Sequence, residues 1–115
     1  MHELSIVESL VEQIEREVDR SGHGGRVRRL ELRIGRLSGV NCESLRFAFE
    51  LLAVDTRIEG AEIDIEEPPA ISTCHDCNAK CELDELLLKC PKCDSTNVTV
   101  DGGREMLLES IELDD

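Results

Sequence analysis

Aromatic residues and positive charge are both scarce in this sequence. It contains no tryptophan and no tyrosine, and Phe47 and Phe49 are its only aromatic residues. Surfaces that bind single-stranded nucleic acid stack bases on aromatic side chains, so such a surface is disfavoured. The chain has 13 lysines and arginines and 26 aspartates and glutamates, which gives a net charge of −13. This excess repels phosphate backbones and anionic membrane surfaces, so we expect neither a nucleic-acid nor a membrane partner.

Long hydrophobic runs are also missing. No apolar segment approaches the roughly 20 residues that a membrane-spanning helix needs. The start, Met1-His2-Glu3-Leu4, lacks the basic residues and apolar core of a signal peptide, so we expect a soluble, cytoplasmic chain. The sequence shows no nucleophile–base pair and no phosphate-binding glycine loop, so an enzyme is the least supported class of protein.

Five regular elements are predicted from hydrophobic periodicity. Apolar residues at steps of three and four predict a first helix over residues 3–20, and alternation predicts strands over 28–34 and 61–66. Residues 104–113 are predicted to form a third strand, whose alternation slips between Leu108 and Ile111 and indicates a bulge. Asn41 is a plausible N-cap for a second helix. The predicted buried stripe of that helix consists of Leu45, Ala48, Phe49 and Leu52, widened by Phe47 and Leu51.

Paired cysteines are the most specific feature of the sequence. Cys74 and Cys77 form one C-x2-C pair, and Cys90 and Cys93 form a second pair twelve residues later. One tight turn aims both sulfurs of a pair at one ion, and two pairs complete the tetrahedral four-sulfur coordination that suits zinc. A closed shell of four sulfurs leaves no position for water, which favours structural over catalytic zinc. Rubredoxin-like iron and redox-active dithiols are the alternatives.

The cysteine-rich segment interrupts the predicted helices and strands. Residues 71–100 carry five of the six cysteines and few apolar side chains, so metal binding must supply much of their stability. We therefore predict an α+β fold. A small two-helix, three-stranded domain (residues 1–68 and 102–115) carries an inserted four-cysteine, zinc-ribbon-like domain (residues 69–101).

The first residues offer donors for a second metal. With a free amino terminus, the α-amine of Met1, the amide nitrogen of His2 and its imidazole can chelate one ion in fused five- and six-membered rings. Glu3 or the next amide can supply a fourth donor. Planar nitrogen and oxygen coordination suits Ni(II) or Cu(II) better than zinc. Taken alone, a histidine at position 2 is more often part of a frayed terminus.

The whole chain resembles the HypA-type family of nickel metallochaperones, through a combination of motifs. These are M-H-E before an amphipathic helix, a strand ending in I-G-R-L-S, a Phe-bearing helix, C-x2-C-x12-C-P-x-C and a terminal Glu-rich strand. The resemblance implies an α/β nickel-binding domain joined to a zinc domain. It implies a role in delivering Ni(II) as cargo during maturation of [NiFe]-hydrogenase.

The same resemblance implies particular ligands and partners. His2 would be the main nickel ligand, assisted by backbone nitrogens of His2 and Glu3, while the two cysteine pairs would hold Zn(II). The implied partners are the nickel-handling GTPase of hydrogenase maturation and the hydrogenase large subunit. Family members often have a carboxylate where this chain has Asn41, a neutral and weaker donor, so we expect Asn41 to act as a helix cap.

Other potential ligands are expected to have structural roles. We expect Cys81 to be a buried small side chain, His75 an exposed turn residue, Cys42 a partly buried helix start and His23 a solvated loop residue. The rival function is a zinc-ribbon interaction module that scaffolds an assembly and never handles nickel. Such a module needs neither a histidine at position 2 nor a free amine, so a nickel titration separates the two functions.

Overall fold

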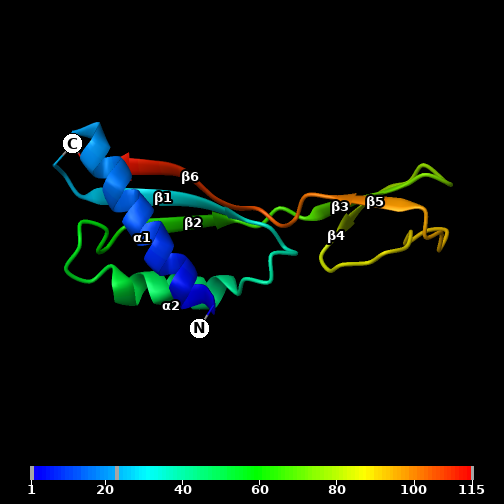
Figure 1. The fold of residues 1–115 in the computed structure, drawn as a ribbon, viewed down its shortest axis with the longest axis horizontal. Coiled ribbons are helices and arrows are strands. Elements are labelled where there is room, and N and C mark those ends of the chain that lie inside the picture. The colour runs from blue at the N-terminus through cyan, green and yellow to red at the C-terminus, as the bar shows by residue number, and fades with distance from the viewer. Residues whose placement is uncertain (1, 23, 115) are drawn as a thin grey trace. The chain divides into compact units, whose positions relative to one another are not determined.

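The computed structural model describes residues 2–22 and 24–114, and only the backbone of residue 2. Within them the chain forms two helices and two three-stranded sheets, which confirms the predicted α+β class (Figure 1). The elements in chain order are α1 (His2–Ser21), β1 (Val27–Ile34), α2 (Cys42–Leu52), β2 (Glu62–Glu66), β3 (Ala70–Cys74), β4 (Lys80–Leu83), β5 (Val98–Asp101) and β6 (Met106–Leu113).

Packing divides the chain into two compact units. Unit 1 comprises the described parts of residues 1–32, 40–65 and 107–115. Unit 2 comprises residues 33–39 and 66–106, and contains the cysteine pairs.

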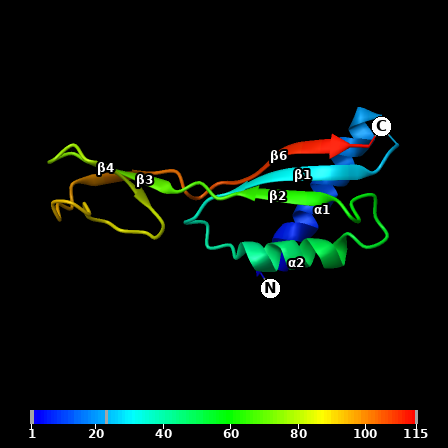
Figure 2. The same cartoon turned by 180° about the vertical axis from the view of Figure 1, so that it is seen from behind.

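Unit 1 is built on the sheet with strand order β2-β1-β6. Helix α1 crosses one face of this sheet, and α2 lies beside β2 at the sheet edge (Figures 1 and 2). The helical and strand periodicities predicted from the sequence converge on one apolar core, as expected when amphipathic elements bury their apolar faces together. Its most completely buried side chains are Val7, Ile14, Leu30, Leu32, Leu45, Phe49 and Ile58.

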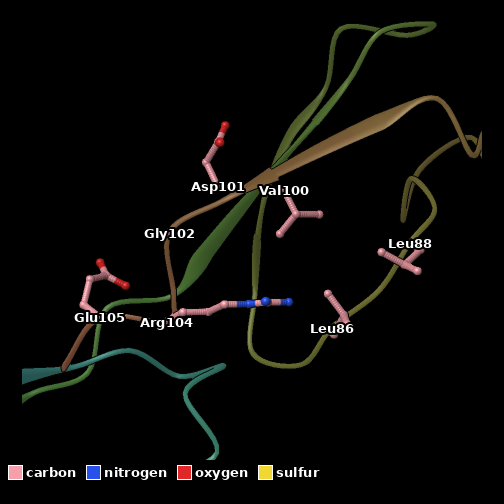
Figure 3. A pocket seen from close by; sticks show the side chains of 7 residues that line it. All are labelled: Leu86, Leu88, Val100, Asp101, Gly102, Arg104 and Glu105. Carbon is pink, nitrogen blue, oxygen red and sulfur yellow. The ribbon is translucent and has the colours of Figure 1, made fainter.

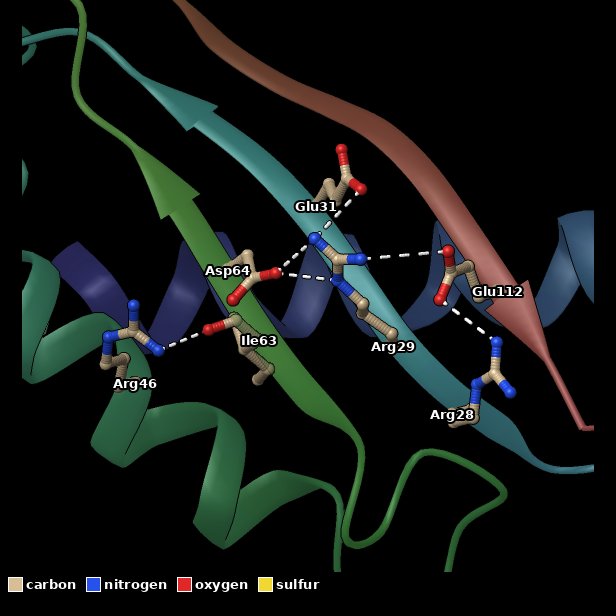
Figure 4. Close-up of polar contacts among 7 residues, drawn as sticks. All are labelled: Arg28, Arg29, Glu31, Arg46, Ile63, Asp64 and Glu112. Atoms are coloured by element: carbon tan, nitrogen blue, oxygen red, sulfur yellow. Dashed lines mark hydrogen bonds and ion pairs between the residues drawn. The ribbon is translucent and has the colours of Figure 1, made fainter.

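The sheet face away from α1 carries a ladder of charged side chains (Figure 4). Arg29 on the central strand β1 donates from Nε to Asp64 Oδ2 on β2 at 2.6 Å, and its Nη2 lies 3.2 Å from Glu31 Oε1. On the other side, Glu112 of β6 lies within 3.8 Å of Arg29 and 3.4 Å of Arg28. Opposite charges on neighbouring strands stabilise their pairing modestly, so these contacts support the register of the sheet.

The buried stripe of α2 is narrower than predicted. Leu45, Ala48 and Phe49 are buried, but Phe47 and Leu51 are 61% and 56% exposed, so the expectation that they extend the buried stripe is wrong. Together with Leu4 of α1 they line a shallow apolar groove. Residues 45, 48, 49 and 52 follow the helical repeat, whereas residues 47 and 51 lie one step off that stripe and turn away from the core.

Unit 2 is built on the second sheet, with strand order β4-β3-β5. Strand β3 pairs antiparallel with both neighbours, and the registers include Ser72 opposite Cys81 and Cys74 opposite Val98. None of these short strands was predicted from the sequence. Each contains only four or five residues, and polar residues occupy about half of their positions.

A tight backbone junction lies where the chain enters and leaves the cysteine-rich segment. Gly35 N donates to Glu105 O at 2.8 Å, and Leu37 N donates to Gly103 O at 2.6 Å. A Cβ at Gly35 would lie only 2.1 Å from the carbonyl carbon of Gly103, so this close approach requires glycine. Gly103 itself has φ +81°, a conformation that glycine adopts without strain. No helix in the described part of the chain has the length and apolar character needed to cross a membrane.

Candidate metal centre

The four cysteines of the two C-x2-C pairs come together in unit 2. Their sulfur atoms all lie within 4.8 Å of one another, and none is in a disulfide. Cys74 Sγ lies 3.6 Å from Cys93 Sγ, and Cys77 Sγ lies 3.6 Å from Cys90 Sγ. These distances far exceed the roughly 2.05 Å of a disulfide bond. This four-cysteine cluster is therefore a set of thiol donors arranged around a common centre.

Each pair is built as the same tight turn. In the first pair, the N–H groups of residues 76 and 77 each point at Cys74 Sγ with a nitrogen–sulfur distance of 3.4 Å. In the second pair, the N–H groups of residues 92 and 93 approach Cys90 Sγ at 3.3 and 3.4 Å. A residue with positive φ follows each pair: Asn78 (φ 63°) and Asp94 (φ 61°). Asn and Asp tolerate this left-handed conformation better than most residues.

The same turns leave the two cysteines of each pair in different environments. The first cysteines, Cys74 and Cys90, are 1% exposed, while Cys77 and Cys93 are exposed. Backbone N–H groups favour the thiolate of each first cysteine. The Cys77 N–H is the main cause that lowers the pKa of Cys74 to about 7. The Cys93 N–H is the main cause that lowers the pKa of Cys90. For Cys93, the N–H of Ser95 favours the thiolate, but hydrogen bonds with the neighbouring sulfurs, that of Cys74 first, together with partial desolvation, outweigh it and raise the pKa to about 12.

The donor set fits zinc. An ion with four Zn–S bonds of about 2.3 Å in a tetrahedron separates its sulfurs by about 3.8 Å, and two of the sulfur–sulfur distances here are 3.6 Å. Four thiolates and no other donor also match the composition of structural zinc sites. The arrangement can hold a divalent ion in a closed shell, and it offers no open position at which water can be activated.

A polar network joins the two cysteine pairs. Asp76, inside the first pair, accepts a hydrogen bond from the Ser95 hydroxyl and a second from Asn97 Nδ2 at 3.3 Å. These hydrogen bonds to the charged form, that of Ser95 first, lower the pKa of the Asp76 carboxyl. Ser95 in turn accepts the Cys90 N–H on its carbonyl at 2.7 Å. Sequence reasoning missed this network, because nothing in the spacing of an exposed Asp and a Ser 19 residues apart marks them as partners.

The remaining sulfur and imidazole candidates lie outside the cluster. Cys81 is half-buried on β4, and Cys42 is half-buried as the first residue of α2, as expected for a helix start. His75 is exposed in the turn of the first pair, as predicted, and its Nε2 lies 2.6 Å from Thr99 Oγ1. His23 falls outside the described residues.

The proposed nickel-binding start of the chain is described only in part. Met1 and the side chain of His2 lie outside the described residues, while the backbone of His2 begins helix α1. Glu3 is half-buried, and its Oε2 accepts a hydrogen bond of 3.4 Å from the backbone N–H of Asn41. Asn41 caps α2 as predicted: its side chain accepts the Ser44 N–H at 3.0 Å. The start of α1 and the loop before α2 are thus in direct contact.

A separate concave region of unit 2 carries no donor set of this kind. It is lined by Leu86, Leu88, Val100, Asp101, Gly102, Arg104 and Glu105 (Figure 3). The Arg104 side chain extends beneath Val100 towards Leu86, while Asp101 and Glu105 point away from it. Its lining therefore combines three aliphatic side chains with one guanidinium and two carboxylates, and it contains no thiol or imidazole.

A small α+β fold that carries a closed four-thiol cluster defines a metal-binding protein. The comparisons with known proteins give the family. The family model described as "Hydrogenase/urease nickel incorporation, metallochaperone, hypA" matches residues 1–113. The chain belongs to the HypA family, and like the rest of that metallochaperone family it is not an enzyme.

Individual relatives agree with this assignment. The chain is 39% identical over 113 residues to the hydrogenase maturation factor HypA of Beijerinckia indica, covering 98% of this chain and 99% of that protein. It is 44% identical over 114 residues to the HypA of Syntrophus aciditrophicus, covering 99% and 98%. The solution structure of the Ni metallochaperone HypA from Helicobacter pylori matches with a TM-score of 0.64 and 28% identity, over 96% of both chains.

Proposed function

We propose that this chain binds Ni(II) through its first residues and delivers it during maturation of [NiFe]-hydrogenase, while a zinc ion on the four-cysteine cluster stabilises unit 2. The observation that carries this proposal is the match of the nickel-incorporation family model to residues 1–113. The proposed nickel ligands are the His2 imidazole and backbone nitrogens of His2 and Glu3. With Met1 as the first residue, its α-amine is a further donor.

The start of α1 is chemically suited to bind nickel. The first four N–H groups of an α-helix have no acceptor inside the helix, so coordination through an amide nitrogen there breaks no helical hydrogen bond. Deprotonated amide and imidazole nitrogens are strong in-plane donors for Ni(II). The contact between Glu3 and the Asn41 N–H supports a site in which the loop before α2 lies next to these donors.

Asn41 makes this proposed site weaker than one with a carboxylate at that position. Its amide oxygen is neutral and already accepts the Ser44 N–H. We expect Asn41→Asp to keep the helix cap, because Asp caps helices as well as Asn does, and to tighten Ni(II) binding by adding a charged oxygen donor. Asn41→Ser is the matched control, because it also keeps a capping oxygen but adds no charge. Equal nickel affinities for the two variants would exclude residue 41 from the ligand environment.

The finer partner assignments rest on the family. We propose that the chain works in the cytoplasm with the nickel-handling GTPase of hydrogenase maturation, and that the recipient is the hydrogenase large subunit. A carrier must release its cargo, and a chelate at a chain start is more open to ligand exchange than a closed cage. Ligand protons compete with nickel. An imidazole with the ordinary pKa of about 6.5 lowers the affinity about fourfold between pH 8 and pH 6, and each amide proton released on binding lowers it further, so we expect a total fall of more than about tenfold.

X-ray absorption on the untagged protein loaded with nickel and zinc tests the proposal, because it reports both coordination shells. We expect nickel among nitrogen and oxygen donors and zinc among four sulfurs. His2→Ala should abolish specific nickel binding and leave zinc near one ion per chain. His75→Ala is the matched control, because it removes an exposed imidazole beside the cysteines and should leave both metals bound. Nickel surrounded by sulfur, with His2→Ala binding it normally, would overturn the proposal.

A fused peptide separates the amine from the other donors. A tag placed ahead of Met1 removes the α-amine, so it should weaken nickel binding much more than the same tag at the C-terminal end. Equal nickel affinities for the two tagged proteins would remove the amine from the ligand set and leave the imidazole and amide donors in place.

A further inference from the structure

We propose that Asp76 is a positioning residue for the four-cysteine cluster: its carboxylate ties the first cysteine pair to the segment after the second pair and holds the four sulfurs at ion-binding spacing. The inference rests on the zinc half of the proposed function. It assigns a role to a side chain that is not itself a ligand.

A continuous series of contacts carries this inference. The Asp76 carboxylate accepts the Ser95 hydroxyl and Asn97 Nδ2. Ser95 Oγ also accepts the Asn97 N–H at 3.0 Å, and the Ser95 carbonyl accepts the Cys90 N–H at 2.7 Å. One carboxylate is therefore connected through Ser95 to the first cysteine of the other pair.

The backbone pairing between these segments is sparse beyond this point. Cys74 pairs with Val98 at the end of the β3–β5 register, and His75 N donates to Asn97 O at 2.9 Å. The turn that presents Cys77 lies past the end of β3. His75 contacts Asn97 O and Thr99 Oγ1 in the segment after the second pair, whereas the Asp76 side chain reaches Ser95, the residue whose carbonyl accepts the Cys90 N–H.

The carboxylate suits its two donors. An ionised carboxylate accepts on both oxygens, and hydrogen bonds to a charged acceptor are stronger than those between neutral groups. In Asp76→Asn one oxygen becomes an NH2 group and the charge is lost. The amide oxygen can still accept Asn97 Nδ2 and the NH2 group can donate to the Ser95 hydroxyl, but both hydrogen bonds are then between neutral groups and weaker. The backbone N–H that points at Cys74 Sγ is unchanged, so the substitution tests the carboxylate alone.

Charge alone predicts the opposite effect. Four thiolates on one divalent ion leave an excess of negative charge, so an adjacent carboxylate is electrostatically unfavourable for the site. Removing a carboxylate should then slow zinc loss, unless that carboxylate also holds the site together. Asp94 supplies the matched control, because it adjoins Cys93, is exposed, and its side chain makes no hydrogen bond or ion pair within the described part of the chain. Its positive φ of 61° also suits asparagine.

The test measures zinc loss from the full-length, zinc-loaded protein to the chromogenic chelator 4-(2-pyridylazo)resorcinol. We compare the wild type with Asp76→Asn, Ser95→Ala, the double variant and Asp94→Asn. We expect Asp76→Asn and Ser95→Ala each to lose zinc about tenfold faster than the wild type, in the range seen for groups that orient metal ligands. Asp94→Asn should lose zinc no faster than the wild type.

Two further readouts separate positioning from general destabilisation. The increase in zinc loss in the double variant should be smaller than the product of the two single increases, because both substitutions break the same Asp76–Ser95 hydrogen bond. The Co(II)-substituted Asp76→Asn protein should show an altered visible spectrum, since cobalt absorption reports the geometry of the sulfur tetrahedron. If Asp76→Asn fails to fold, Ser95→Ala, which removes one hydroxyl group, carries the same comparison.

The outcomes distinguish this inference from the proposed function. If the wild type binds zinc on four sulfurs, and Asp76→Asn and Ser95→Ala both behave like Asp94→Asn, the positioning role is overturned and the zinc site stands. Additive effects of the two substitutions would also overturn it. A wild type that binds no zinc would overturn the zinc half of the proposed function, and this inference with it.

Discussion

Substituting Gly35 by alanine should destabilise unit 2 strongly. A Cβ at this position would lie 2.1 Å from the Gly103 carbonyl carbon, 2.2 Å from its oxygen and 2.5 Å from Arg104 N. All three neighbours are backbone atoms, so no flexible side chain can rotate out of the way. Because real Cβ contacts essentially never fall below 3.0 Å, the two strands of backbone must separate by about 1 Å.

The magnitude follows from what this separation breaks. The separation lengthens two backbone hydrogen bonds past the usual range: Gly35 N to Glu105 O, now 2.8 Å, and Leu37 N to Gly103 O, now 2.6 Å. Each such bond contributes about 0.5–1.5 kcal/mol, and inserting a methyl group into a packed site costs typically about 1–3 kcal/mol. We therefore expect Gly35→Ala to lower the free energy of unfolding by about 2–6 kcal/mol, a large part of the roughly 5–15 kcal/mol of a typical domain.

The assay is urea unfolding of the zinc-loaded protein, followed by circular dichroism because the chain has no tryptophan or tyrosine to report by fluorescence. Amide spectra of residues 33–39 and 66–106 show whether the loss begins in unit 2. Gly24→Ala is the matched control: a Cβ there meets nothing within 4 Å, and the residue has an ordinary φ, so stability should stay the same or rise by up to about 1 kcal/mol. An ordinary surface substitution changes the free energy of unfolding by up to about 0.5 kcal/mol. If the free energies of unfolding of Gly35→Ala and Gly24→Ala differ by no more than this, the steric reasoning is refuted.

Three further predictions concern the helices and the metal. Phe49→Ala should cost about 3–5 kcal/mol because Phe49 is fully buried, whereas Phe47→Ala should change stability by under about 0.5 kcal/mol; similar losses in urea unfolding would contradict the burial of the α2 face. Asn41→Ala should cost about 1 kcal/mol through loss of the cap to Ser44 N, and thermal unfolding of Asn41→Ser, which retains a capping oxygen, should show most of that stability restored. Removing zinc with a chelator should collapse the amide signal dispersion of residues 70–101 while the signals of the unit 1 core persist, and retained dispersion in the apo protein would show that this segment folds without metal.

Local patterns in the sequence predicted much of the fold. The three- and four-residue steps of α1, the alternation of β1 and the cap at Asn41 are all short-range signals that each depend on a few neighbouring residues. The four cysteines were equally predictable, because the geometry of one C-x2-C turn is set within four residues. Each of these features is specified by the chain segment that forms it.

Features that depend on distant segments were not predictable. The strands of unit 2 are short, half polar and paired between residues as far apart as Ile71 and Asp101, so no local period reveals them. The apolar character of Phe47 predicts a core position, but it does not tell which side of α2 packs against the core, and Phe47 lies on the exposed side. The connection from Asp76 to Ser95 depends on both cysteine turns forming first.

The unequal burial of the four cysteines would give a bound ion one covered side and one side facing solvent. Cys77 and Cys93 are exposed, one in each turn, whereas Cys74 and Cys90 are 1% exposed. Each turn would therefore present one thiolate to an incoming chelator and keep its other thiolate covered. Cys74 and Cys90 belong to different turns, so the covered pair would hold the two loops together through a bound ion.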